Sequence, residues 1–177
     1  MMKQKILNDI NKVYKSGYLE YILTKYVDKD YWMASLGTAF SKNHIENLTD
    51  LNYSKCFTMC INISQIDSNV GTVEFDKHIK VAGFLDRLQL QISIIAPYAT
   101  FKYIRYEYKE GRVIYRDSFE PFFEEDSSIG QKVTEFLISN SLILLDESSL
   151  STEVPEVTLE LREENVTVYH CLFEDGY

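Results

Sequence analysis

The sequence predicts an α+β fold in which a mainly antiparallel β-sheet is flanked by an N-terminal helix and by a helix near residues 128–141. Three observations predict this class. Apolar residues recur at helical spacing at the start of the chain and again near residue 130. Between these segments, apolar and polar residues alternate, as in strands with one buried face. Only seven glycines and three prolines occur and no linker interrupts the 177 residues, so a single domain over 1–177 is expected.

The first helix is predicted from a stripe of apolar residues. Ile6, Ile10 and Val13 recur every three or four positions, which places them on one helical face. Gly17 is expected to end this helix, and residues 18–26 form a second helical segment. A sheet covered on one face by such helices buries their apolar stripes, and this is the layering that we expect.

The first strand is predicted over residues 56–64, where apolar and polar side chains alternate. A turn at 67–71 is expected to lead back through a strand at 72–75. Residues 77–88 are ambiguous and compatible with a short helix. Alternation resumes at residue 90 and ends at Pro97, which cannot donate to a strand ladder.

The clearest hairpin joins residues 100–108 to 113–115, because Gly111 supplies the positive φ that a tight turn requires. Residues 126–128 (Asp-Ser-Ser) are expected to supply the N-cap of the next helix, and Ser128 and Gln131 have the spacing of a capping box.

The rest of the chain is expected to add strands. Residues 142–145 form a short buried strand or the end of the preceding helix. A last hairpin is expected to pair residues 157–161 with 166–172, since both runs alternate.

Charge is divided unevenly along the chain, whose formal net charge is −9. Residues 1–116 hold 16 basic and 12 acidic side chains, whereas residues 117–177 hold 2 basic and 15 acidic ones. A strongly acidic surface repels phosphate backbones and anionic lipids, and it speeds the approach of a basic protein. We therefore expect a basic protein partner and no nucleic acid, although the same charge also serves a surface that is only solubilising.

No stretch of about 18 apolar residues occurs, so no membrane span is expected. The three cysteines, Cys56, Cys60 and Cys171, are odd in number and lack Cys-x-x-Cys spacing, which favours a reducing compartment. These features predict a cytoplasmic location.

Motifs of catalysis are missing from the sequence. Neither a glycine-rich phosphate loop nor a Gly-x-Ser-x-Gly elbow occurs. His44, His78 and His170 are scattered and form no metal-binding pattern. The sequence therefore assigns no catalytic residue, no cofactor and no metal ligand.

A candidate partner-binding surface combines acidic and aromatic residues. Two adjacent phenylalanines between acids suit an aromatic anchor within an acidic rim, and they equally suit a plug of the core. The candidate residues are Glu120, Phe122, Phe123, Glu124, Glu125 and Asp126, together with Glu163 and Glu164.

These features favour an acidic protein-binding module, of the kind that an inhibitor or immunity protein uses to mask a basic partner. The alternative is a small-ligand-binding protein or an enzyme, with a pocket between sheet and helices. The sequence fixes neither the identity of the partner nor the oligomeric state.

Overall fold

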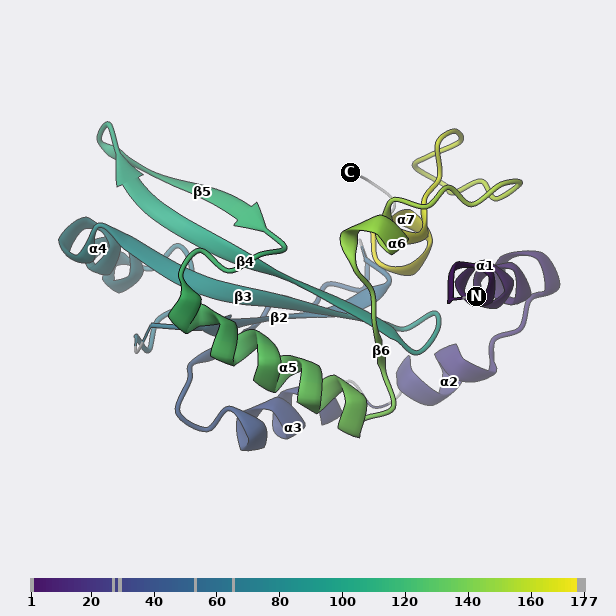
Figure 1. Ribbon diagram of the computed structural model, residues 1–177, viewed down its shortest axis with the longest axis horizontal. Coiled ribbons are helices and arrows are strands. Elements are labelled where there is room, and N and C mark those ends of the chain that lie inside the picture. The colour runs from purple at the N-terminus through teal and green to yellow at the C-terminus, as the bar shows by residue number, and fades with distance from the viewer. Residues whose placement is uncertain (1, 27, 29, 53, 65, 175–177) are drawn as a thin grey trace.

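The computed structural model describes residues 2–26, 28, 30–52, 54–64 and 66–174, and Figure 1 shows their arrangement. A six-stranded sheet crosses the molecule with helices on both sides. The strands are β1 (Ile45–Asn47), β2 (Cys56–Asn62), β3 (Phe84–Ser93), β4 (Tyr98–Lys109), β5 (Arg112–Ser118) and β6 (Ile143–Leu144). The helices are α1 (Met2–Ser16), α2 (Glu20–Tyr26), α3 (Tyr31–Ala39), α4 (Val73–Ala82), α5 (Ser127–Ser139), α6 (Glu147–Leu150) and α7 (Val168–Leu172), and the 3-10 turn η1 (Glu124–Asp126) precedes α5.

The first five strands lie in sequence order, each antiparallel to the next. The sixth, β6, pairs in parallel with the start of β4. The predicted α+β class is confirmed, with its N-terminal helix and with α5 at the place expected near residues 128–141.

Helices cover both faces of the sheet, whereas the sequence predicted a cover on one face. Leu90 of β3 points into the main core, which α3 and α5 complete. On the opposite face, Leu85 packs on Phe75 of α4. Further along that same face, Ser93 Oγ donates to the carbonyl of Leu172 in α7 at 2.7 Å. As a result all seven residues of β2 are buried, not half of them.

Polar side chains on the α7 side of the sheet are buried in hydrogen bonds instead of facing water. Gln91 Nε2 donates to Glu174 Oε1 at 3.0 Å, and Thr100 Oγ1 donates to the Leu145 carbonyl at 3.2 Å. A buried polar group needs such a partner to offset its lost hydration. The alternation of the strands was therefore read correctly, but its polar positions do not mark a solvated face.

The β4–β5 hairpin confirms the clearest expectation from the sequence. Lys109 pairs with Arg112, so the turn contains only Glu110 and Gly111. Both turn residues have positive φ, 51° and 82°, which is the backbone of the hairpin turn that matches strand twist.

The expected strand at 72–75 is wrong, because these residues begin α4. Thr72 accepts a hydrogen bond from Phe75 N at 3.3 Å through its side chain, and this N-cap starts the helix. Phe75 and Ile79, four residues apart, then fall on one buried helical face. Gly83 closes α4 with φ 86°.

The expected C-terminal hairpin is also wrong. Residues 153–167 form only two isolated bridges, Glu153 with Thr167 and Leu159 with Arg162. Residues 168–172 form α7, which begins with a capping box between Thr167 and His170. The consecutive residues Cys171 and Leu172 are both fully buried. A helix allows two neighbouring side chains to be buried, whereas a strand with one buried face does not.

The start of α5 differs in detail from the sequence prediction. Asp126 occupies the N-cap position, but its side chain makes no capping bond. Ser128 Oγ donates instead to the Glu125 carbonyl at 3.1 Å, so the expected capping box does not form. The Asp126 carboxyl group turns toward the sheet, where it meets Asp86 and Arg105.

Candidate protein-binding site

The segment between β5 and α5, residues 119–126, holds six of the eight residues singled out from the sequence. Its two adjacent phenylalanines, Phe122 and Phe123, lie against a buried cation, the Arg105 guanidinium group. The ring centroids of Phe122 and Phe123 lie 4.7 and 4.2 Å from the guanidinium carbon of Arg105. Phe122 is half-buried, and its ring centroid also lies 4.8 Å from the guanidinium carbon of Arg116. Phe123 is 44 % exposed. The pair therefore fastens this segment to the sheet.

The acidic residues of this segment divide into exposed and buried ones. Glu120, Glu124 and Glu125 are exposed. Asp126 is buried, and its Oδ2 has no hydrogen-bond partner among the described residues. Burial raises the pKa of Asp126 above its usual range, and the nearby Asp86 carboxylate raises it further.

Glu163 and Glu164 lie elsewhere. Both are exposed on the loop that precedes α7, and Glu163 lines a small groove of about 180 Å³ there. Figure 1 places this loop at one end of the molecule, beyond α6 and α7, and places the start of α5 toward the other end. The structure thus does not gather the eight candidate residues into one surface.

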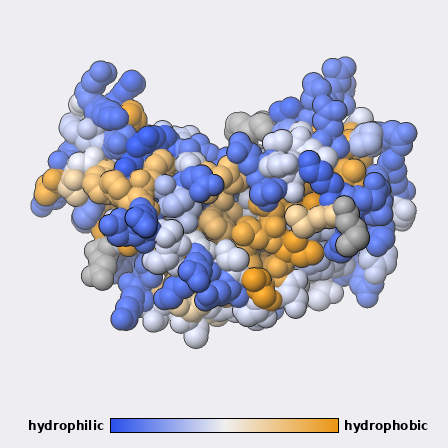
Figure 2. Space-filling model, in the orientation of Figure 1, coloured by the Kyte–Doolittle hydropathy of each residue, from blue (hydrophilic) through white to orange (hydrophobic). Residues whose placement is uncertain are grey.

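A larger groove lies beside β4, and it includes Glu120. Its floor is formed by four apolar side chains that are half-buried or buried: Phe101, Phe119, Leu144 and Leu145. The exposed Met2 lies at its edge. Exposed polar side chains form its rim: Glu120, Asp146, Glu147 and Ser148. We call this site of about 510 Å³ the β4 groove. Figure 2 shows apolar surface over β6, bordered by hydrophilic residues.

Two carboxylates of the rim have no counterion within the described part of the chain. Glu120 and Glu147 form no ion pair there, whereas Asp117 pairs with Lys102 at 2.7 Å. Asp146 accepts a hydrogen bond from Ser149 N at 2.8 Å, which caps α6. Hydrogen bonding with the Ser149 side chain, together with this backbone bond and the nearby Lys3, lowers the pKa of Asp146 below its usual range. Two acidic residues of the rim, Glu120 and Glu147, are thus exposed without an ion pair among the described residues, whereas Lys3 lies close enough to Asp146 to act on it electrostatically.

The edge of β4 is open at the groove. On this edge β4 pairs with β6 at Tyr98 and Ala99, and with β5 from Tyr103 onward. Residues 100–102 lie between these two partners, and on this edge no described strand pairs with them, while their other edge pairs with β3. The groove thus lies where this edge of β4 changes partner from β6 to β5, because Phe101 is one of its lining residues.

Sequence reasoning identified Glu120 but missed the other members of the groove. Asp146 and Glu147 directly follow the apolar run 142–145, and this position next to an apolar run is the local pattern that could have marked them as residues of an apolar groove with an acidic rim. The floor joins residues from the N-terminus, β4, the 119–126 segment and the β6–α6 turn. Only the tertiary fold brings these four stretches together.

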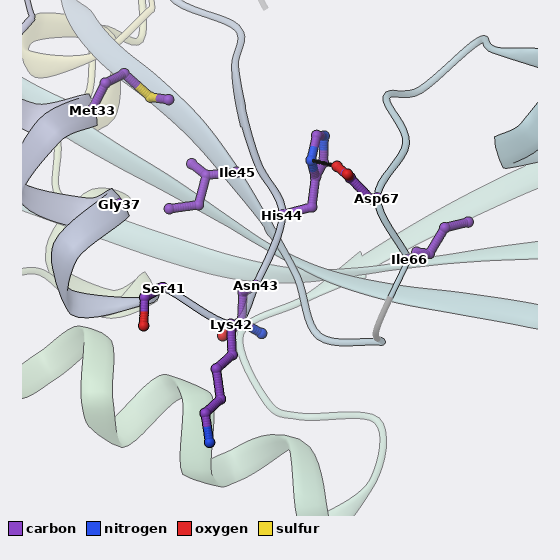
Figure 3. Close-up of a pocket in the computed structure, with 9 residues that line it drawn as sticks. All are labelled: Met33, Gly37, Ser41, Lys42, Asn43, His44, Ile45, Ile66 and Asp67. Atoms are coloured by element: carbon purple, nitrogen blue, oxygen red, sulfur yellow. Dashed lines mark ion pairs between the residues drawn. The ribbon is translucent and has the colours of Figure 1, made fainter.

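A second pocket, of about 730 Å³, lies between α3, β1 and residues 66–67 (Figure 3). It contains a His44–Asp67 pair, with 2.6 Å between Nδ1 and Oδ1. The other ring nitrogen, Nε2, lies 2.6 Å from Asn69 Oδ1. Figure 3 shows the Ser41 hydroxyl pointing away from the His44 ring. Both nitrogens of the His44 ring thus face a hydrogen-bond partner from the same loop, Asp67 and Asn69.

The cysteines do not supply a nucleophile. Burial raises the pKa of Cys56 and of Cys60 to about 11, and that of Cys171 to about 12. A thiol with such a pKa carries almost no thiolate at neutral pH. Within the ranges that the structure covers, no three His, Cys, Asp or Glu side chains are grouped to hold a metal ion. None of the helices described is both long and apolar enough for a bilayer crossing.

The chain was compared with family models, with curated proteins and with solved structures, and none of the three comparisons gave a match.

Proposed function

We propose that this chain is a protein-binding module that masks a basic surface of a partner protein through the β4 groove, as an inhibitor or immunity protein does. The observation that carries the proposal is an apolar floor beneath a rim on which two carboxylates, Glu120 and Glu147, form no ion pair with any described residue. Apolar contact supplies most of the affinity of such a site, and the charged rim supplies orientation and association rate.

The two walls of the groove are held firmly, which suits a site that receives a partner without rearrangement. Phe122 and Phe123 hold one wall through Arg105. The other wall is held by β6, where Ile143 N donates to the Pro97 carbonyl at 2.9 Å. A site that is already formed loses little conformational entropy on binding, so more of the contact energy appears as affinity.

Selection from a displayed library of random peptides tests this proposal. The wild type is expected to enrich peptides that are basic and contain apolar residues. Glu120→Gln combined with Glu147→Gln is expected to lose that enrichment. Glu163→Gln combined with Glu164→Gln removes the same charge from the distant loop and is expected to keep it. Enrichment of neutral or acidic peptides, or enrichment that survives the Glu120 and Glu147 changes, would contradict the proposal.

The kinetics of an enriched peptide give a second test. Reversal of Glu120, Glu124 and Glu125 to Lys is expected to slow association and to weaken its dependence on salt, because like charges then meet during encounter. Stopped-flow measurements at low and high salt report both quantities. An unchanged association rate at low salt would remove these carboxylates from the encounter.

A further inference from the structure

The rings of the 119–126 segment already act as cation receptors within the molecule. Lys102 Nζ lies 5.0 Å from the Phe119 ring centroid. Phe122 and Phe123 stack on Arg105, as described above. Aromatic faces attract cations through their electron-rich surface, and arginine is the commonest partner because its planar group stacks on the ring.

The β4 groove offers the same combination of groups to a ligand from outside. Phe101 and Phe119 lie in its floor, and Glu120 and Glu147 stand on its rim. The two carboxylates belong to different elements, since Glu120 follows β5 and Glu147 is the first residue of α6. A cation that enters the groove thus meets rings below it and negative charge from two directions.

This geometry distinguishes arginine from lysine. A guanidinium group presents five N–H donors in a plane, so it bonds two carboxylates while its face lies on a ring. It is also less strongly hydrated than an ammonium group and gives up less solvation over an apolar floor. An ammonium group is a compact charge that keeps its water, and it gains little from the rings.

The buried Arg105 shows this mode of recognition inside the protein. Its guanidinium donates two bonds to the Asp86 carboxylate and stacks on three rings, those of Phe84, Phe122 and Phe123. The groove has the same kinds of group, carboxylates and phenylalanine rings. Lys102 lies over the Phe119 ring, but within the described residues no cation forms an ion pair with Glu120 or Glu147.

From these observations we infer that the β4 groove recognises an arginine side chain of the partner protein, flanked by apolar residues, in preference to lysine. The inference rests on the proposed function and adds the chemistry of the anchoring residue. It does not depend on which partner protein supplies the arginine.

Two capped peptides of matched charge test it, one with the sequence Leu-Arg-Leu-Arg and one with Leu-Lys-Leu-Lys. Titration into the isotope-labelled protein, followed by NMR, gives the dissociation constants and maps the amides that shift. The arginine peptide is expected to bind roughly fivefold more tightly, with the largest shifts at Phe101, Phe119 and Leu144.

Phe119→Leu is the decisive variant, because it keeps the floor apolar and removes a ring. It is expected to bring the ratio of the two dissociation constants close to one without weakening the lysine peptide. Tyr115→Leu removes a ring that is 70 % exposed and outside the groove, and it is expected to leave the ratio unchanged. Thermal melts followed by circular dichroism check that both variants are folded.

Each outcome is decisive. Equal affinity of the two peptides, with shifts in the groove, would overturn the arginine preference and leave the proposed function standing. A preference that survives Phe119→Leu would overturn the role of the ring. Shifts confined to the loop of Glu163 and Glu164, or no binding of either peptide, would overturn both the inference and the proposed function.

Discussion

Arg105 and Asp86 face each other across β4 and β3 as a buried ion pair, in which Arg105 Nε donates to Asp86 Oδ1 at 2.7 Å and Nη2 donates to Oδ2. Three phenylalanine rings surround the guanidinium group, those of Phe84, Phe122 and Phe123. Because two of these rings belong to the segment that carries Glu120, the ion pair positions one wall of the β4 groove.

Loss of this cation is expected to be costly. Arg105→Met leaves the Asp86 carboxylate buried without its partner, and we expect a loss of about 3–5 kcal/mol in the free energy of unfolding. Urea denaturation measures it. Lys15→Met breaks the exposed pair between Lys15 and Glu156 and is expected to change stability by no more than the error of the measurement. An equal loss in the free energy of unfolding for both variants would show that the buried pair matters no more to stability than the exposed one.

The Asp126 carboxyl group is expected to make stability depend on pH. Its pKa is raised in the folded protein, so its contribution to stability is present at acidic pH and is lost as the pH rises through that raised value. Asp126→Asn mimics the protonated acid. We therefore expect the variant to be more stable than the wild type at neutral pH, and we expect this advantage to shrink below the usual pKa of aspartate.

Urea denaturation across that pH range provides the measurement for Asp126→Asn. Glu164→Gln removes the same charge from an exposed loop and controls for the change in net charge. A constant difference between Asp126→Asn and the wild type at every pH would contradict the expected linkage.

Gly130 lets α5 approach the sheet closely. A Cβ atom at this position would meet the Tyr103 hydroxyl, so Gly130→Ala is expected to destabilise by roughly 1–3 kcal/mol. Helix propensity alone predicts the opposite sign, a gain of about 1 kcal/mol. Adding Tyr103→Phe to Gly130→Ala is expected to recover part of the loss, and thermal denaturation of the single and double variants measures this coupling.

Gly37 provides the matched control, because it is also helical and a Cβ atom there would meet nothing within 4 Å. Gly37→Ala is expected to stabilise the protein by up to about 1 kcal/mol. A stabilising Gly130→Ala would show that α5 moves away from Tyr103 without cost.

Residues 153–174 are expected to contribute to the core although they form only isolated bridges and the short helix α7. Val168→Ala removes buried methyl groups from α7 and is expected to cost roughly 1–4 kcal/mol. Leu161 is 68 % exposed on the preceding loop, and Leu161→Ala is expected to leave the melting temperature nearly unchanged. Calorimetry gives the melting temperatures of Val168→Ala and Leu161→Ala. Similar melting temperatures of the two variants would contradict the packing of α7.

Local chemistry explains which elements the sequence predicted. The β4–β5 hairpin was predicted because Gly111 and its flanking alternation act over a few residues. At the start of α4, the β-branched residues Thr72 and Val73 favoured the prediction of a strand. The helix forms there because Thr72 caps it and because Phe75 and Ile79 are buried on one helical face. Tertiary packing overrides intrinsic propensity in such short segments.

The candidate site shows the same limit. Charge counting found Glu120 because it looks for acidic residues along the chain. It could not find Phe101 or Leu144, since an apolar side chain in a groove has the same local pattern as one in the core. It also joined Glu163 to Glu120, because a sum of charges over a segment carries no information about which side of a sheet each residue reaches.

The cover that α7 places on the sheet has a consequence for synthesis. Ser93 is bonded to Leu172, which lies 79 residues further along the chain, and Tyr14 of α1 is bonded to the Cys171 carbonyl across 157 residues. On a translating ribosome, β3 therefore emerges long before the helix that shields one of its faces. The face of β3 that α7 covers therefore stays without this cover until residue 172 has left the exit tunnel.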